Sequence, residues 1–149
     1  MPDTFVLDCS VAAKWVLPEP DRAPALGLFE RYASGEVLLI APDILLAEFA
    51  SLVAKRNRRK EISAAQAHQA FSLMTKCAPR LFDMRPRLFR ALDLSLQYQL
   101  SLWDCVYLAP ALEHHCPVFT ADLRLFPSRE GRTSLCSAGA IADPPLPLR

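Results

Sequence analysis

Four carboxylates in this chain of 149 residues stand where a folded protein usually places apolar side chains. Asp8 and Asp122 each end a short apolar run, Glu48 interrupts an apolar segment, and Asp104 stands near the start of another. Carboxylates are seldom buried without a partner. Several ionised carboxylates close together repel one another, which raises their pKa values unless a cation compensates their charge. The four acids therefore predict a site for a divalent metal ion.

The chemistry expected of such a site is hydrolysis of a phosphodiester. Mg²⁺ prefers oxygen ligands and commonly combines a few carboxylates with water and substrate phosphate oxygens. A bound metal lowers the pKa of water and neutralises charge that develops on phosphorus. The run His114-His115-Cys116 is a poor alternative metal site, because adjacent residues on a helix point about 100° apart.

Short apolar runs that alternate with longer helical patterns must position these acids. This alternation predicts βαβ units and an α/β fold, a three-layer α/β/α sandwich with a central, mostly parallel sheet. We expect strands at 4–7, 37–40, 80–84, 118–121 and 134–136, and helices at 10–17, 21–34, 43–57, 63–77, 86–98 and 103–115.

Two of the acids and two hydroxyls fall at the strand ends of this predicted sheet. Ligands of parallel sheets bind at the carboxyl ends of the strands, so Asp8 and Asp122 should project at one edge. Thr120 is two residues before Asp122 and shares its face of the strand. Ser10 is expected to cap the first helix. All four side chains should lie near the same crevice.

The two helical acids can be placed by the rotation of 100° per residue. Glu48 lies about 40° from Leu52 and so flanks the apolar stripe of its helix. Asp104 shares a helix face with Leu108 and therefore points with the buried side. Pro110 lacks an amide hydrogen and predicts a kink or a restart within this second helix.

Each acid also has an ordinary structural interpretation. Asp8 and Asp122 are consistent with turn or helix-capping residues. Asp104 is consistent with a helix N-cap, and Glu48 with an ion pair to a neighbouring Arg or Lys. The convergence of all four on one edge under one topology favours the functional interpretation.

The composition describes one globular domain, with 52% hydrophobic and 22% charged residues. We expect the domain to span 1–142 and a Pro-rich tail to occupy 143–149. No apolar run approaches the roughly 18 residues of a membrane span, and the N-terminus lacks a basic start. A cytoplasmic protein is therefore expected. The five cysteines form no C-x-x-C pair and are expected to be free thiols.

Basic residues cluster in the segment 55–60, although the net charge is only +1. This near balance of positive and negative charges excludes a polycationic nucleic-acid binder. The cluster is consistent with a solvated end that complements the dipole of a helix C-terminus. It is also consistent with contacts to the phosphate backbone of a nucleic acid, for which the candidates are Lys55, Arg56, Arg58 and Arg59.

Four segments in order resemble PIN-domain ribonucleases, most closely VapC-type toxins of bacterial toxin–antitoxin pairs. The resemblance rests on Val6-Leu7-Asp8-Cys9-Ser10-Val11 with Lys14-Trp15, Leu46-Ala47-Glu48, the stretch 100–109 around Trp103-Asp104, and Phe119-Thr120-Ala121-Asp122. It implies a three-layer α/β/α fold and RNA cleavage that depends on Mg²⁺ or Mn²⁺. It also implies a homodimer and inhibition by a cognate antitoxin protein. The resemblance assigns metal binding and catalysis to Asp8, Glu48, Asp104 and Asp122, with Ser10 and Thr120 as supporting hydroxyls.

Two alternatives to the ribonuclease agree less well with the sequence. A catalytically silent RNA-binding or regulatory PIN domain is disfavoured because all four acids are present. A phosphatase with an Asp nucleophile, like the haloacid-dehalogenase enzymes, requires a second Asp two residues on. Asp8 is instead followed by Cys9 and Ser10, so this chemistry is not expected.

Overall fold

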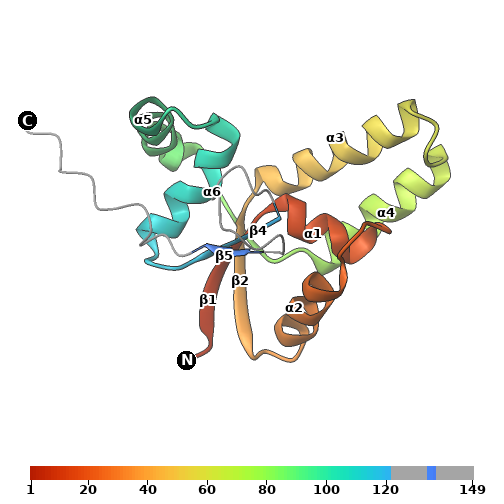
Figure 1. Cartoon of the computed structure of the whole chain (residues 1–149), viewed down its shortest axis with the longest axis horizontal. Coiled ribbons are helices and arrows are strands. Elements are labelled where there is room, and N and C mark those ends of the chain that lie inside the picture. The colour runs from red at the N-terminus through yellow and green to blue at the C-terminus, as the bar shows by residue number, and fades with distance from the viewer. Residues whose placement is uncertain (122–133, 137–149) are drawn as a thin grey trace, which may run out of the picture.

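The computed structural model describes residues 1–121 and 134–136. Its sheet has the strand order β3-β2-β1-β4-β5 (Figure 1). The first four strands in this order run parallel and β5 pairs antiparallel with β4, as expected of a mostly parallel sheet. The strands are β1 Asp3–Leu7, β2 Val37–Pro42, β3 Arg80–Phe82, β4 Val118–Thr120 and β5 Ser134–Cys136.

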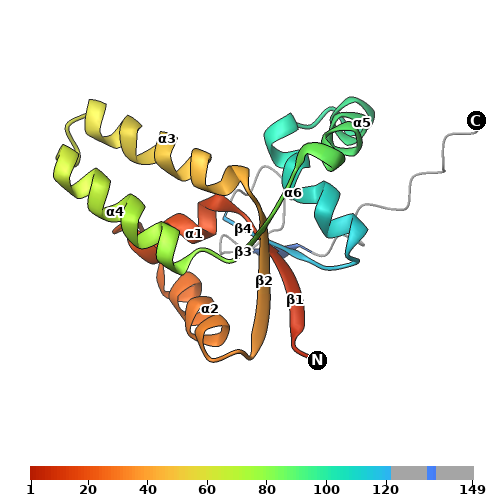
Figure 2. The same cartoon turned by 180° about the vertical axis from the view of Figure 1, so that it is seen from behind.

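Helices cover both faces of this sheet. Figures 1 and 2 show α1 to α4 on one side of the strands and α5 and α6 on the other. The helices are α1 Cys9–Val16, α2 Ala23–Ala33, α3 Ile44–Arg58, α4 Ala64–Cys77, α5 Leu88–Tyr98 and α6 Leu102–Glu113, and a short 3₁₀ turn spans Arg85–Arg87. The predicted α/β/α sandwich is therefore confirmed.

The core lies on both faces of the central strand. Val6 and Leu7 of β1 are fully buried, as are Leu39 of β2 and Val118 of β4. A parallel strand with helices on both sides has no solvent face, so its sequence is almost continuously apolar. The apolar run therefore stops only where β1 ends, at Asp8.

Helices α3 and α4 pack against each other and reach away from the sheet as a hairpin (Figures 1 and 2). Ser63 begins α4 with a capping box, in which its hydroxyl accepts from the Gln66 amide at 3.1 Å. The Gln66 side chain in turn accepts from the Ser63 amide at 2.8 Å. The basic segment 55–60 lies at the outer end of this hairpin.

Three local predictions are corrected by the structure. Asp8, not Ser10, is the N-cap of α1. Ser101 caps α6, so the interpretation of Asp104 as an N-cap is wrong. The helix does not restart at Pro110 but continues through it. Every residue from 105 to 111 is buried, and this packing outweighs the lost backbone hydrogen bond.

None of the described helices is long and apolar enough to cross a membrane. Four of the five cysteines, Cys9, Cys77, Cys105 and Cys116, are free thiols, as predicted. The predicted tail 143–149 lies outside the described residues.

Candidate functional site

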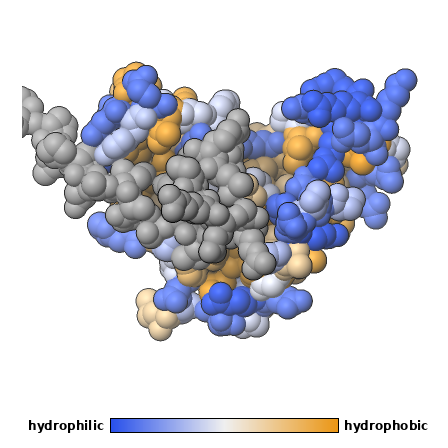
Figure 3. Space-filling model, in the orientation of Figure 1, coloured by the Kyte–Doolittle hydropathy of each residue, from blue (hydrophilic) through white to orange (hydrophobic). Residues whose placement is uncertain are grey.

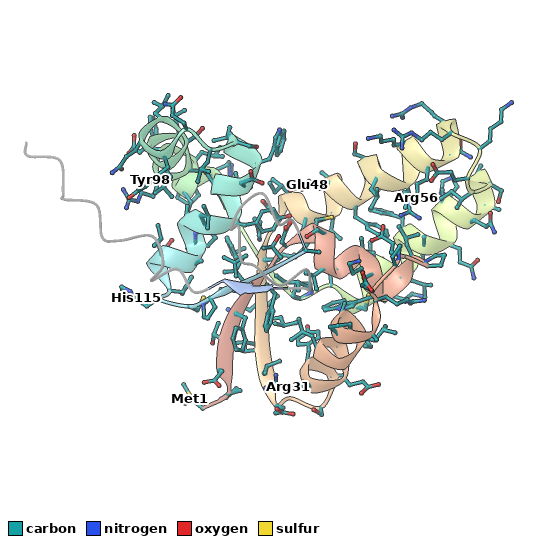
Figure 4. The ribbon with its side chains drawn as sticks, in the orientation of Figure 1. Met1, Arg31, Glu48, Arg56, Tyr98 and His115 are labelled. Carbon is teal, nitrogen blue, oxygen red and sulfur yellow. The ribbon has the colours of Figure 1, made fainter. Side chains whose placement is uncertain are left out.

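A solvent-open cavity of about 540 Å³ lies where β1 ends and α1, α3 and α6 converge. It brings together three of the four predicted acids, and Figure 4 labels one of them, Glu48, near the start of α3. The lining residues are Asp8, Cys9, Ser10, Glu48, Leu52, Ser101, Trp103, Asp104 and Tyr107. The fourth acid, Asp122, lies outside the described residues.

Asp8 is held by hydroxyl donors from two elements. Its side chain is buried, and its Oδ2 accepts from Thr120 Oγ1 at 2.6 Å and from Ser10 Oγ at 2.8 Å. Its Oδ1 accepts from the Ser10 amide at 3.4 Å, which caps α1. These donors fix the orientation of the carboxylate in the cavity.

Ser10 connects this carboxylate to the end of β4. While its Oγ donates to Asp8, it accepts from the Ala121 amide at 2.9 Å. Its Oγ also lies 3.4 Å from Thr120 Oγ1. The two predicted supporting hydroxyls therefore join the ends of β1 and β4 around Asp8.

Glu48 is half-buried and is oriented by Tyr107, whose Oη donates to Glu48 Oε1 at 2.9 Å. Burial raises the pKa of Glu48 to about 7, although the hydrogen bond from Tyr107 opposes this shift. The negative charges of Asp8 and Asp104 raise the pKa further. Within the described residues Glu48 forms no ion pair, so its interpretation as the partner of an Arg or Lys is not supported there.

Asp104 lies in the first turn of α6, where its side chain is half-buried. Ser101 sets the start of this helix by accepting from the Trp103 amide at 3.1 Å. Tyr107 follows one turn after Asp104 and lines the same cavity. The helix thus presents an acid and a phenol to the space that Asp8 and Glu48 also face.

Sequence reasoning missed Tyr107 and Trp103. Tyr107 is almost fully buried, and burial, followed by the charge of Glu48, raises its pKa. A signal for it was present, because it follows Asp104 by three positions and residues at this spacing share a helix face. The sequence gives no comparable signal that Trp103 lines the cavity, because an aromatic residue near the start of a helix is common in proteins of many functions.

The donor set fits a hard divalent cation. Its side-chain oxygens come from three carboxylates, and hydroxyls from Ser10 and Tyr107 line the same cavity. In the described part of the chain, no three acids, histidines or cysteines approach closely enough to hold an ion by themselves. Mg²⁺ retains several of its waters in proteins, and a cavity of this size accommodates a hydrated ion. A cation would also relieve the repulsion that raises the pKa of Glu48.

The four predicted RNA-contacting cations occupy different environments. Arg56 forms an ion pair with Glu19, whose carboxylate also lies 3.9 Å from Lys14 Nζ. Figure 4 labels Arg56 farther along α3 than Glu48. The remaining three predicted cations, Lys55, Arg58 and Arg59, are exposed. The structure therefore separates Arg56, which is engaged within the protein, from the others.

Comparison with known proteins gives one family match and several similar folds. Residues 5–129 match the family model of the PIN domain. A search of curated proteins finds no match.

Several solved structures share this fold. PAE2754 from Pyrobaculum aerophilum is 15% identical with a TM-score of 0.65, and the match covers 87% of this chain and 82% of that one. VapBC2 from Rickettsia felis, bound to a DNA fragment from its promoter, is 15% identical with a TM-score of 0.63, covering 83% and 91%. Mycobacterium tuberculosis VapC20, a toxin that cleaves the sarcin-ricin loop, is 15% identical with a TM-score of 0.61, covering 81% and 92%.

Proposed function

This chain belongs to the PIN-domain family, and on that premise we propose that it is an endoribonuclease that hydrolyses RNA phosphodiester bonds with Mg²⁺ or Mn²⁺. The observation that carries the proposal is the cavity shared by Asp8, Glu48 and Asp104. We assign metal binding and catalysis to these acids and to Asp122, and supporting roles to Ser10 and Thr120. The proposed nuclease domain spans 1–142, with 143–149 as a tail.

The acids have separable roles in this proposal. Asp8, whose carboxylate is fixed by two hydroxyls, and Asp104 would hold the metal ion directly or through water. The bound ion would lower the pKa of water and neutralise charge on the phosphate. Glu48, whose pKa is raised to about 7 in the metal-free chain, would ionise when the cation binds and would then accept a proton from an attacking water. Tyr107 orients Glu48 for that task.

The basic end of the α3–α4 hairpin supports RNA as the substrate. Figure 3 shows strongly hydrophilic surface over this end of the molecule. Lys55, Arg58 and Arg59 are exposed there and are available to phosphates. Arg56 is left out of this surface because it is paired with Glu19.

The proposal includes a role as the toxin of a cytoplasmic toxin–antitoxin pair. Structures of similar fold include a toxin–antitoxin complex from Klebsiella pneumoniae, whose match covers 87% of this chain. FitAB bound to a DNA fragment also has a similar fold. These likenesses support a small antitoxin protein as a partner.

The proposal also includes a homodimer, formed through the outer face of α5. Phe89, Leu92 and Leu96 are exposed, and they lie within about 60° of one another around the helix. Figure 3 shows hydrophobic surface over α5. Arg90 and Asp93 are also exposed and flank this stripe on one side. In an antiparallel pair of α5 helices related by a two-fold axis, each Arg90 would face the Asp93 of the other copy.

The test is cleavage of purified RNA by the full chain with Mg²⁺ or Mn²⁺, compared with the same reaction in chelator. We expect cleavage to require the metal and to be lost in Asp8→Asn and in Asp104→Asn. Asp83→Asn is the matched control, because Asp83 pairs with Arg85 at the surface away from the cavity. The proposal would be refuted if all three variants cleaved RNA equally well, or if the wild-type chain cleaved RNA as well in chelator as in Mg²⁺ or Mn²⁺.

A further inference from the structure

The two tryptophans of this chain have opposite environments. Trp15 is 8% exposed, donates from its Nε1 to the Ala25 carbonyl at 2.8 Å, and packs near Phe29 and Tyr32. Trp103 is 63% exposed, and its indole makes no hydrogen bond or ring contact within the described residues. A large aromatic face left open to water is costly in solvation. Trp103 lines the acidic cavity, so a ligand bound in that cavity would contact its indole.

Helix α6 holds Trp103 and Asp104 toward one space. Asp104 is rotated about 100° from Trp103, and Tyr107 falls between them at about 40°. All three side chains line the same cavity. The Ser101 hydroxyl accepts from the Trp103 amide at 3.1 Å, which fixes the first turn of the helix. Asp104 and the indole are therefore held on one helix, and Asp8 and Glu48 line the same cavity from other elements.

A nucleotide strand has the two features that this arrangement would bind. Its phosphate requires compensation of charge, which a metal ion held by the acids would supply, and its base presents a flat apolar face one sugar away. Unpaired bases stack readily on exposed aromatic side chains, and the stacking tolerates any base sequence. Bases inside a duplex are already stacked and are not available.

We propose that Trp103 is a stacking platform for an unpaired nucleobase next to the scissile phosphate. This inference rests on the proposed ribonuclease function and adds to it a subsite for the base beside the scissile phosphate. Trp103 acts here by binding the substrate, so its loss should raise KM more than it lowers kcat. A contact with another protein chain is the competing explanation for an exposed Trp, and the experiment separates the two.

The experiment measures binding of a single-stranded RNA of about ten nucleotides in Mg²⁺. The parent protein is the full chain with Asp8→Asn, which prevents cleavage during the titration. Tryptophan fluorescence reports the contact, because Trp15 is shielded while Trp103 is open to quenching by a stacked base. We expect Trp103→Leu to abolish the quenching and to raise the Kd, measured by anisotropy of a labelled strand, roughly 5- to 150-fold.

Two variants and one altered strand make the result specific to stacking. Trp103→Phe should keep the Kd within about threefold, because an aromatic face remains. Leu102→Ala changes an exposed neighbour that does not line the cavity, and should bind like the parent. An abasic strand of equal length should bind the parent as weakly as the normal strand binds Trp103→Leu.

The inference is overturned if Trp103→Leu or the abasic strand binds as tightly as its reference, or if Phe does not rescue binding. It is also overturned if Trp103→Leu changes the oligomeric mass while the Kd stays constant, which would indicate a protein contact. Failure of the proposed function looks different. In that case the wild-type chain would not cleave RNA with either metal, although binding could still depend on Trp103.

Discussion

At the scale of single residues, Glu48 makes the site sensitive to pH. Its pKa of about 7 in the folded chain exceeds its ordinary value of 4.5, so the folded state holds this proton more tightly than the unfolded state. Below pH 4.5 both states are protonated, and the folded state has its full relative stability. Between pH 4.5 and 7 the unfolded state ionises first, and the stability contributed by the protonated group is lost.

We therefore predict that the metal-free protein loses stability as pH rises through this window, and that Glu48→Gln removes this part of the loss. Mg²⁺ favours the ionised carboxylate, so it should raise the melting temperature more above pH 7 than below pH 4.5. Thermal unfolding in chelator and in Mg²⁺ measures both effects. Parallel pH profiles of the wild type and Glu48→Gln would contradict the prediction.

At the scale of elements, the end of β4 stabilises the carboxylate that ends β1. Thr120 is 1% exposed and donates to Asp8 Oδ2 at 2.6 Å. We predict that Thr120→Val, which keeps the shape but removes the hydroxyl, destabilises the fold by about 1–3 kcal/mol. It should also weaken metal binding, since Asp8 loses a fixed orientation.

Thr120→Ser is the matched control for this substitution because it retains the hydroxyl. Chemical denaturation measures the free energy of unfolding, and calorimetric titration with Mn²⁺ measures the metal affinity. If Val and Ser variants bind Mn²⁺ equally, Thr120 supports the fold alone and has no role in the site.

The elements also show how far the sequence could predict this site. The ends of the strands could be predicted from the sequence, because a buried parallel strand is apolar until it reaches the edge of the sheet, and Asp8 lies at that edge. The hydrogen bond from Tyr107 to Glu48 was not readable, because it joins α6 to α3 across 59 positions of sequence. The pairing of Arg56 with Glu19 was hidden for the same reason. The periodicity of a sequence predicts which face of a helix is buried, but it does not predict which other element packs against that face.

Local signals failed where packing decided the outcome. Pro110 predicts an interruption when its own helix is considered alone, yet the buried neighbours Leu108 and Ala111 hold the helix through it. Ser10 is a good cap by residue type, but Asp8 takes the cap and Ser10 instead links Asp8 to Ala121. In both cases a tertiary contact replaced the local preference.

At the scale of the whole molecule, the exposed stripe of α5 predicts the state of association. We expect the wild-type chain to have the mass of a dimer in light scattering, and Leu96→Glu to have the mass of a monomer. A carboxylate introduced into this apolar stripe would be buried without a partner when two copies pair, which is strongly unfavourable. Leu73→Glu places the same charge on an exposed leucine of α4 and should remain dimeric. A monomeric wild type, or two variants that behave alike, would refute the α5 interface.

The hairpin of α3 and α4 predicts how salt affects the reaction. Each phosphate contact to a single strand contributes a slope of about −0.7 in the logarithm of affinity against the logarithm of salt concentration. If Arg58 and Arg59 contact the RNA backbone, the double variant Arg58→Gln, Arg59→Gln should raise KM and reduce this slope by about 1.4.

Arg56→Gln is the control. It should leave the slope unchanged, because Arg56 is paired with Glu19, and should instead lower the melting temperature. Steady-state cleavage over a series of salt concentrations separates the two cases. A cluster that only complements the dipole of α3 would give the same slope in every variant, since a solvated helix end releases no counterions when RNA binds.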